Sequence, residues 1–196
     1  MVTSCSECDK GEMSVRDEQR EAVVERLAAH LLATGLSRTS LRQLAAAAGV
    51  SDRMLLYYFA DKAEVLSAVM ARVAGELSMR LAEAIPGEAP LKPSILVRRA
   101  AAFTTGPEMR GFMRLWVEVV AAAARGEAPF PAIVAQVMAG FRLWVDARLD
   151  LPAGADREAT AAAIIAVIDG LALVDICAED DIATRMSAAL GALLAE

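Results

Sequence analysis

Residues 39–66 read TSLRQLAAAAGVSDRMLLYYFADKAEVL, with two short helix-forming stretches on either side of a glycine. Ser40 and Gln43 have the spacing of a capping box, in which two side chains bond free backbone N–H groups at the start of a helix. Gly49 tolerates the positive φ of a tight turn after a helix. Ser51 can cap the helix that follows. The stretch therefore predicts two short helices joined by a tight turn.

These helices are expected over residues 41–48 and 52–59. Ala45 is small enough to let them cross closely. The apolar positions supply a shared inner face: Leu41, Leu44, Ala48, Val50, Leu55 and Tyr58. Two short helices that meet these demands over twenty residues have the outline of a helix-turn-helix.

A helix-turn-helix docked on DNA places the N-terminal residues of its second helix against base edges in the major groove. In this chain these residues are Ser51, Asp52, Arg53 and Met54. Arginine can read guanine and an apolar side chain can touch a thymine methyl group. Phosphate contacts, which position a protein without reading sequence, are expected from Thr39, Ser40, Arg42, Tyr57, Tyr58 and Lys62.

The composition favours an all-α protein. Hydrophobic residues make up 56% of the 196 residues, much of this is alanine, and only 5% of the chain is aromatic. Alanine is the best helix former, whereas strands favour β-branched and aromatic residues. Helical segments are also expected over 15–34, about 61–85, 92–105, 108–125, 130–149, 157–178 and 182–195, which gives about nine helices.

The chain divides into three parts. Residues 1–13 are polar and lack a period, so we expect a disordered tail. Cys5 and Cys8 in this tail lack the further ligands of a zinc site. We expect a three-helix domain with the helix-turn-helix over 14–62, and a second, all-helical domain over 63–196 that a long helix joins to the first.

The sequence contains no recognisable catalytic, metal or cofactor site. The only histidine, His30, has no cysteine beside it, and no glycine-rich phosphate loop or H-E-x-x-H motif occurs. Three cysteines fit a reducing compartment. No signal peptide is recognised, and the longest apolar stretch, 161–174, is interrupted by Asp169. We therefore expect a cytoplasmic protein without a membrane partner.

Charge is unevenly distributed along the chain. The formal net charge is −6, which is unfavourable for a nonspecific polyanion binder. Residues 36–62, however, carry four basic and two acidic side chains. The segment expected to meet DNA is thus locally positive.

Aromatic residues and methionines gather in the second domain. Phe112 and Trp116 share one helix face, and Phe141 and Trp144 share another. A packed core would explain any single member, but as a group they are the best candidates for an adaptable apolar pocket: Phe103, Met109, Phe112, Met113, Trp116, Met138, Phe141 and Trp144. Glu118, Arg99 and Arg114 are candidates for polar groups in it.

The segment 157–178 is apolar around most of its circumference, which indicates burial on several sides. We expect it to pair with the segment 182–195 and with the same two helices of a second copy. The expected interface residues are Ile165, Ile168, Leu171, Leu190 and Leu194. The alternative is that both helices only close the core of one protomer.

Residues 16–66, and 39–66 above all, resemble the DNA-binding domain of TetR-family transcriptional regulators. The signature of this family is similar to the stretch LLYYFADK at 55–62. The resemblance implies a three-helix DNA-binding domain, a linking fourth helix and a helical domain that dimerises and binds a small molecule. Arg53 and Met54 depart from it, since the family has a small residue followed by threonine there, and Leu56 replaces an aromatic residue.

From these features we expect a homodimeric repressor that binds a palindromic DNA operator and is released by a largely apolar small-molecule effector. The alternative is an all-α enzyme or a helical adaptor in which residues 40–59 are a simple hairpin. An enzyme would need acidic or metal-binding clusters in the second domain, and the sequence contains none that is recognisable.

Overall fold

The structure is a computed structural model that describes residues 15–37, 39–177, 185, 186 and 189. Within this part of the chain eight α-helices and one short 3-10 helix follow one another, without a β-strand. They are α1 (Val15–Thr34), α2 (Leu41–Ala48), α3 (Asp52–Tyr58), α4 (Lys62–Ala84), α5 (Pro93–Thr104), η1 (Pro107–Met109), α6 (Arg110–Ala124), α7 (Phe130–Asp146) and α8 (Arg157–Cys177). The all-α prediction is confirmed.

The predicted helix starts coincide with the observed caps. The hydroxyl oxygen of Ser40 accepts a hydrogen bond from the N–H of Gln43, whose side chain reaches back to the backbone of Ser40. Ser51 caps α3 through the N–H of Met54, and Asp61 caps α4. The tail over 1–13 and nearly all of the ninth predicted helix, with Leu190 and Leu194, lie outside the described residues.

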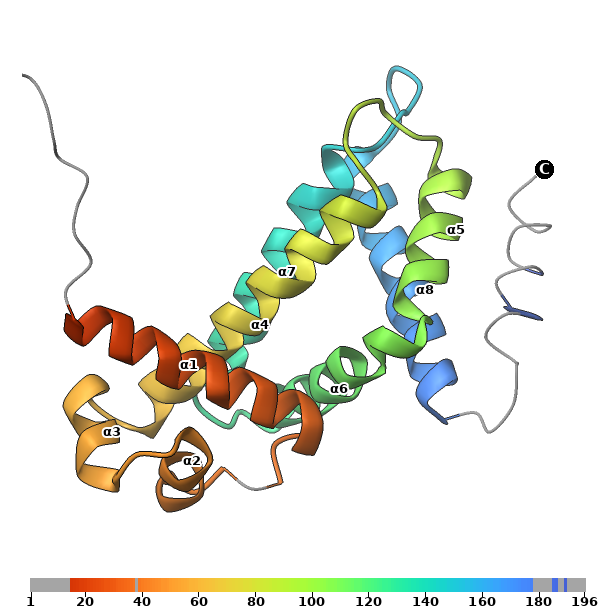
Figure 1. Ribbon diagram of the computed structural model, residues 1–196. Coiled ribbons are helices and arrows are strands. Elements are labelled where there is room, and N and C mark those ends of the chain that lie inside the picture. The colour runs from red at the N-terminus through yellow and green to blue at the C-terminus, as the bar shows by residue number, and fades with distance from the viewer. Residues whose placement is uncertain (1–14, 38, 178–184, 187–188, 190–196) are drawn as a thin grey trace, which may run out of the picture.

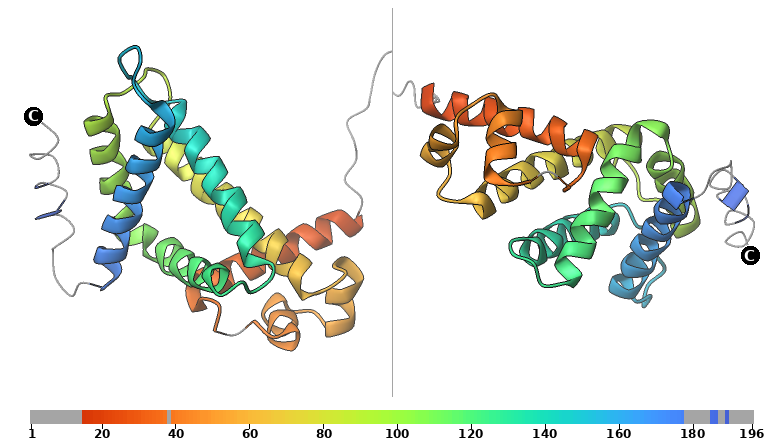
Figure 2. Two further views of the ribbon diagram at one scale, coloured as in Figure 1. Left: turned by 180° about the vertical axis from the view of Figure 1, so that it is seen from behind. Right: turned by 90° about the horizontal axis from the view of Figure 1, so that it is seen from below.

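The helices form a small headpiece and a larger bundle (Figure 1). α1, α2 and α3 make the headpiece, and α4 runs from it to the far end of the bundle. α7 lies along α4, α5 packs on α8, and α6 crosses between the lower end of α8 and the headpiece, as the views from behind and from below also show (Figure 2). α4 and α6 are thus the two helices that connect the bundle with the headpiece.

Two hydrophobic cores hold the chain together. The lower core joins the headpiece to α4 and α6, and it includes the fully buried residues Leu27, Leu44, Leu55, Val65 and Met109. The upper core lies at the far end of α4 among α5, α7 and α8. Because Val65 packs with the headpiece, the expected domain boundary at residue 62 marks the start of α4 and not a break in the core.

The far end of the bundle is tied together by backbone and arginine contacts. The N–H of Leu91 donates to the carbonyl of Arg148 (2.7 Å), and the N–H of Asp150 donates to the carbonyl of Leu91 (2.9 Å). The guanidinium of Arg148 also donates to the carbonyl of Ile85 (3.0 Å). These bonds fix the loop after α4 to the loop after α7, so the two long helices are joined at this end.

Candidate DNA-binding surface and effector cavity

The turn between α2 and α3 has the geometry that its sequence predicts. Gly49 has a φ of +68° and donates its N–H to the carbonyl of Ala46 (3.1 Å). Val50 donates to the carbonyl of Ala45 (3.0 Å). Ala45 itself is buried where α2 meets the rest of the headpiece. These contacts close the end of α2 and direct the chain into α3.

α3 separates its residues into two faces. Leu55 is 0% exposed and packs into the lower core, whereas Tyr57 is 58% exposed. The four residues predicted to meet base edges lie on the exposed surface at the start of this helix: Ser51, Asp52, Arg53 and Met54. The hydroxyl of Ser51 accepts the N–H of Met54 (3.2 Å), so its first role is to cap the helix.

The structure contradicts one predicted phosphate contact. Tyr58 is 6% exposed, and its hydroxyl donates to the side-chain oxygen of Gln19 in α1 (2.7 Å). Tyr58 lies three residues after Leu55 and shares its inward face. The residue therefore fastens α3 to α1, and its hydroxyl is not presented to DNA.

The other predicted phosphate contacts lie around α2 and the start of α4. Ser40, Arg42 and Lys62 are exposed. Thr39 is half-buried and donates its hydroxyl hydrogen to the carbonyl of Leu36 (3.1 Å). The start of α4 is less open to an anion than the sequence suggests, because Asp61 already accepts a hydrogen bond from the N–H of Glu64 (2.8 Å).

Two arginines that the sequence reasoning missed brace α3 from α1. The guanidinium of Arg16 lies 4.9 Å from the ring centre of Tyr57 and donates to the carbonyl of Tyr57 (3.1 Å). Arg20 lies 4.6 Å from the ring centre of Phe59. Both are cation–π contacts. Their spacing of four residues in α1 was a visible signal, and exposed Arg16 extends the positive surface beside α3.

A junction connects the bundle to the headpiece through α6. The carboxylate of Glu118 accepts a hydrogen bond from the backbone N–H of Leu36, in the loop between α1 and α2 (2.6 Å). Nearby, Gly111 of α6 lies so close to α1 that a Cβ atom there would be 3.1 Å from the carbonyl oxygen of Leu32. α6 is therefore in direct contact with α1 and with the loop that precedes α2.

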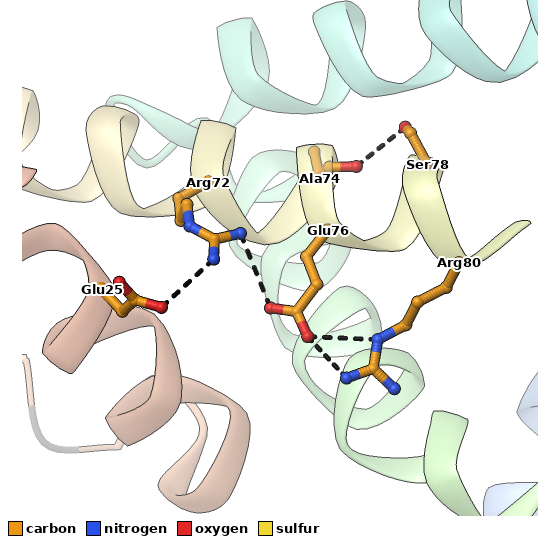
Figure 3. Close-up of polar contacts among 6 residues, drawn as sticks. All are labelled: Glu25, Arg72, Ala74, Glu76, Ser78 and Arg80. Atoms are coloured by element: carbon orange, nitrogen blue, oxygen red, sulfur yellow. Dashed lines mark hydrogen bonds and ion pairs between the residues drawn. The ribbon is translucent and has the colours of Figure 1, made fainter. Parts of the chain in front are cut away.

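Ion pairs connect Arg72 of α4 with α1 and with its neighbour on α4 (Figure 3). Arg72 pairs with Glu25 of α1 (3.4 Å) and with Glu76 (3.8 Å), and Glu76 pairs with Arg80 (2.6 Å). Such exposed pairs contribute little to stability. Only the pair of Arg72 with Glu25 joins the two helices, since the other two lie within α4.

A cavity lies inside the bundle where the two cores meet. Its volume is about 50 Å³, and five of the eight predicted pocket residues line it, namely Phe103, Met113, Trp116, Phe141 and Trp144. Phe103 and Phe141 pack against both cores. Met109 and Phe112 are buried in the lower core outside the lining, and Met138 lines a separate groove between α7 and α8.

The polar groups of the cavity are not those considered from sequence. Arg99 and Arg114 are exposed, and Glu118 belongs to the junction. The cavity is lined instead by Thr104 and by Asp169. Burial raises the pKa of the Asp169 carboxyl, and the indole N–H of Trp116 offsets part of that rise. Asp169 was visible in the sequence as a break in an apolar run.

α8 places its predicted interface residues differently from expectation. Leu171 is 5% exposed and Ile165 is buried, while Ile165 and half-buried Ile168 line the cavity of their own chain. Leu173 and Val174, by contrast, are exposed. The reason is that α8 is apolar all round, so its sequence does not distinguish the two sides.

α8 is also the one described helix that could cross a membrane by length and composition, a property that core helices of soluble proteins share. Only a third of the residues in its most apolar 18-residue stretch are buried. Among the residues that the structure describes, no three histidine, cysteine, aspartate or glutamate side chains gather in a way that could hold a metal ion. α8 therefore leaves apolar side chains, among them Leu173 and Val174, exposed to solvent.

Comparisons with known proteins support the assignment of the helix-turn-helix. Residues 26–69, from the second half of α1 into α4, match the family described as bacterial regulatory proteins, tetR family. A search of curated proteins finds no match.

Several solved structures share the fold. A TetR-family transcriptional regulator from Cytophaga hutchinsonii superposes with a TM-score of 0.74 at 16% identity, over 94% of this chain and 96% of that chain. A transcriptional regulator from Rhodococcus sp. Rha1 gives 0.71 at 22% identity, over 88% and 92%. The multidrug binding protein EbrR, complexed with imidazole, gives 0.61 at 22% identity, over 94% and 96%. The match identifies the helix-turn-helix domain of this chain as one of the bacterial regulatory proteins of the tetR family, and the solved structures show that the whole chain has the same fold as regulators of that family.

Proposed function

We propose that this regulator is a cytoplasmic homodimeric repressor that binds a palindromic operator and leaves it when a small apolar effector enters the bundle. The observation that carries the proposal is the exposed face of α3, where Arg53 and Tyr57 point away from a helix that Leu55 and Tyr58 anchor. In a dimer, two such helices would enter successive major grooves about one turn apart. The match to a family of regulators decides against the enzyme alternative.

The subunit interface is proposed on the outward side of α8. Leu173 and Val174 are exposed there, and exposed Gly170 beside them would allow a close approach of a second helix. Apolar side chains in such a row favour burial against a partner. This choice replaces Ile165 and Leu171, which already pack inside their own chain.

Release would follow from the position of the cavity at the meeting of the two cores. A ligand that widens the cavity would press on Met113 and Trp116 of α6, five and two residues before Glu118. Glu118 holds the loop before α2. The ligand shifts the population only in so far as it binds the two arrangements with different affinity.

A DNA-binding assay tests the central claim. Fluorescence anisotropy with the DNA upstream of the protein's own gene should show binding at low salt, and Arg53→Ala with Tyr57→Ala should weaken it at least about 100-fold. Arg98→Ala, an exposed arginine at the far part of the bundle, is the control for lost charge. Equal binding by the double variant, or none by the wild type, would leave the adaptor alternative in place.

The junction has its own matched pair of variants. Glu118→Ala removes the acceptor of the Leu36 N–H, whereas Glu118→Gln keeps an oxygen in its place. We expect the alanine variant to lose operator affinity by about tenfold, since one hydrogen bond to a charged group is worth about 1.5 kcal/mol. The glutamine variant should lose less. If both variants bind the operator as tightly as the wild type in anisotropy titrations, the junction does not position the headpiece.

A further inference from the structure

The cavity contains a carboxylate at the point where it approaches the surface. Asp169 of α8 lines both the inner cavity and the groove between α7 and α8, whose volume is about 450 Å³. Ile165 is the other residue that the two spaces share. An acid thus stands between the groove and the aromatic interior, where a ligand passing from one to the other would meet it.

The charge of Asp169 is not balanced by the chain that the structure describes. Arg142, which lines the same groove, pairs with Glu158 (3.5 Å). No ion pair of Asp169 occurs among the described residues. Asp169 is half-buried, and the described residues give its carboxylate a hydrogen bond from the indole of Trp116 but no cation. A partly desolvated carboxylate is stabilised by a nearby opposite charge, so a cation from outside would find its counter-charge here.

The walls of the cavity suit the same kind of molecule. Four aromatic rings line it: Phe103, Trp116, Phe141 and Trp144. Aromatic faces attract organic cations in a dry site. The indole N–H of Trp144 is buried and has no acceptor among the described residues. An oxygen atom on a ligand would satisfy it.

We propose that the effector of this regulator is a lipophilic cation that enters from the groove between α7 and α8 and places its positive charge on Asp169 among the aromatic rings. The proposal rests on the proposed function and names the chemical class of its ligand. The cavity of about 50 Å³ is smaller than a drug-sized molecule requires. Binding must therefore part the two cores, which is the movement that release needs.

Three adamantane derivatives of nearly equal shape test the proposal: 1-adamantanemethylamine, a cation; 1-adamantanemethanol, a neutral molecule; and 1-adamantanecarboxylate, an anion. Both tryptophans of the chain line the cavity, and the probes do not absorb where tryptophan does. Fluorescence titration and calorimetry can follow the binding. We expect the amine to bind at least about tenfold more tightly than the alcohol, and the carboxylate to bind least.

Two variants locate the charge that makes the difference. Asp169→Asn keeps the shape of the side chain and should reduce the preference for the amine over the alcohol to within about twofold. Glu83→Gln, which removes an exposed acid from α4, should leave the preference unchanged. Thermal melting of both variants checks that they are folded.

The outcomes separate this proposal from the proposed function. An alcohol or carboxylate that binds as well as the amine, a preference that survives in Asp169→Asn, or no binding of any probe would overturn the cationic effector. The anisotropy assay with operator DNA uses no effector, so loss of DNA binding would overturn the regulator independently.

Discussion

α3 and α8 both carry proposed functional surfaces, but their sequences differ in how much they reveal. α3 has seven residues, a cap at Ser51 and a clear division between buried Leu55 and exposed Tyr57. α8 has 21 residues, most of them apolar on every side. A helix with one polar face shows which side meets the solvent, whereas a helix without one does not.

The two surfaces also differ in how far they depend on neighbouring helices. The side chains of α3 that face outward are available wherever the helix is anchored. On α8, Ile165 and Asp169 line a cavity, and exposed Leu173 lies one turn beyond Asp169. The roles of α8 are thus assigned by its neighbours α5, α6 and α7. Which residues of such a helix form a site depends on the helices that pack on it, and the sequence of the helix alone does not show it.

Two adjacent leucines of α3 give the largest expected contrast. Leu55→Ala should lower the free energy of unfolding by about 2–5 kcal/mol, because it opens a cavity in the lower core. Leu56 is 46% exposed, so Leu56→Ala should lower the free energy of unfolding by no more than about 0.5 kcal/mol. Urea denaturation followed by circular dichroism measures both. Similar losses would mean that α3 does not divide into the two faces described.

The sequence predicted the headpiece well because its information is local. The caps at Ser40, Ser51 and Asp61 and the glycine at 49 fix where helices begin and end, and the structure has them at these residues. Tyr58 was misassigned because a tyrosine can either reach outward or pack. Its three-residue spacing from Leu55 would have placed it on the inner face.

The bundle was predicted only in part, because its site depends on contacts between distant segments. Of the two pairs that share a helix face, Phe141 and Trp144 both line the cavity, whereas Phe112 lies outside it and only Trp116 of that pair lines it. Nothing local, however, shows that Asp169 faces inward while Arg99 faces solvent. The inward and outward sides of α8 are likewise set by the helices that pack on it.

Two leucines of α8, two residues apart, test its two sides. Leu171→Ala should lower the free energy of unfolding by about 2–4 kcal/mol and leave the dimer intact, since the side chain is buried in its own chain. Leu173→Arg should raise the dimer dissociation constant at least about 100-fold, equivalent to about 2.7 kcal/mol, with little effect on the fold. Light scattering over a range of protein concentrations reports the assembly. A dimer that withstands Leu173→Arg would move the interface elsewhere.

Two glycines compare the turn before α3 with an ordinary helix. Gly49→Ala should destabilise the chain by about 1 kcal/mol or more, because alanine is strained at a φ of +68°. Gly75→Ala in α4, where no atom lies within 4 Å of the added methyl group, should stabilise it by about 0.5–1 kcal/mol. Thermal melting of the two variants should shift in opposite directions. A shift in the same direction would mean that the turn does not depend on the left-handed conformation.

The smallest expected effect concerns the inner side of α8 and depends on pH. Burial raises the pKa of Asp169 in the folded chain above its ordinary value of 3.8. The folded chain therefore binds this proton more tightly than the unfolded chain does. The contribution of Asp169 to stability is most favourable below the unfolded pKa and is lost as pH rises through the folded pKa. Asparagine carries no charge, so Asp169→Asn should melt at a higher temperature than the wild type at pH 7.

This advantage should shrink as the pH falls towards 4, where aspartate is itself increasingly protonated. Asp175 is the control on the same helix, because it is an even more buried aspartate that pairs with Arg110. Asp175→Asn leaves that arginine without its partner and should lower the melting temperature at pH 7. A lower melting temperature for Asp169→Asn at pH 7 would show that Asp169 already has a counter-charge within the protein, and α8 would then have no unpaired acid to offer a ligand.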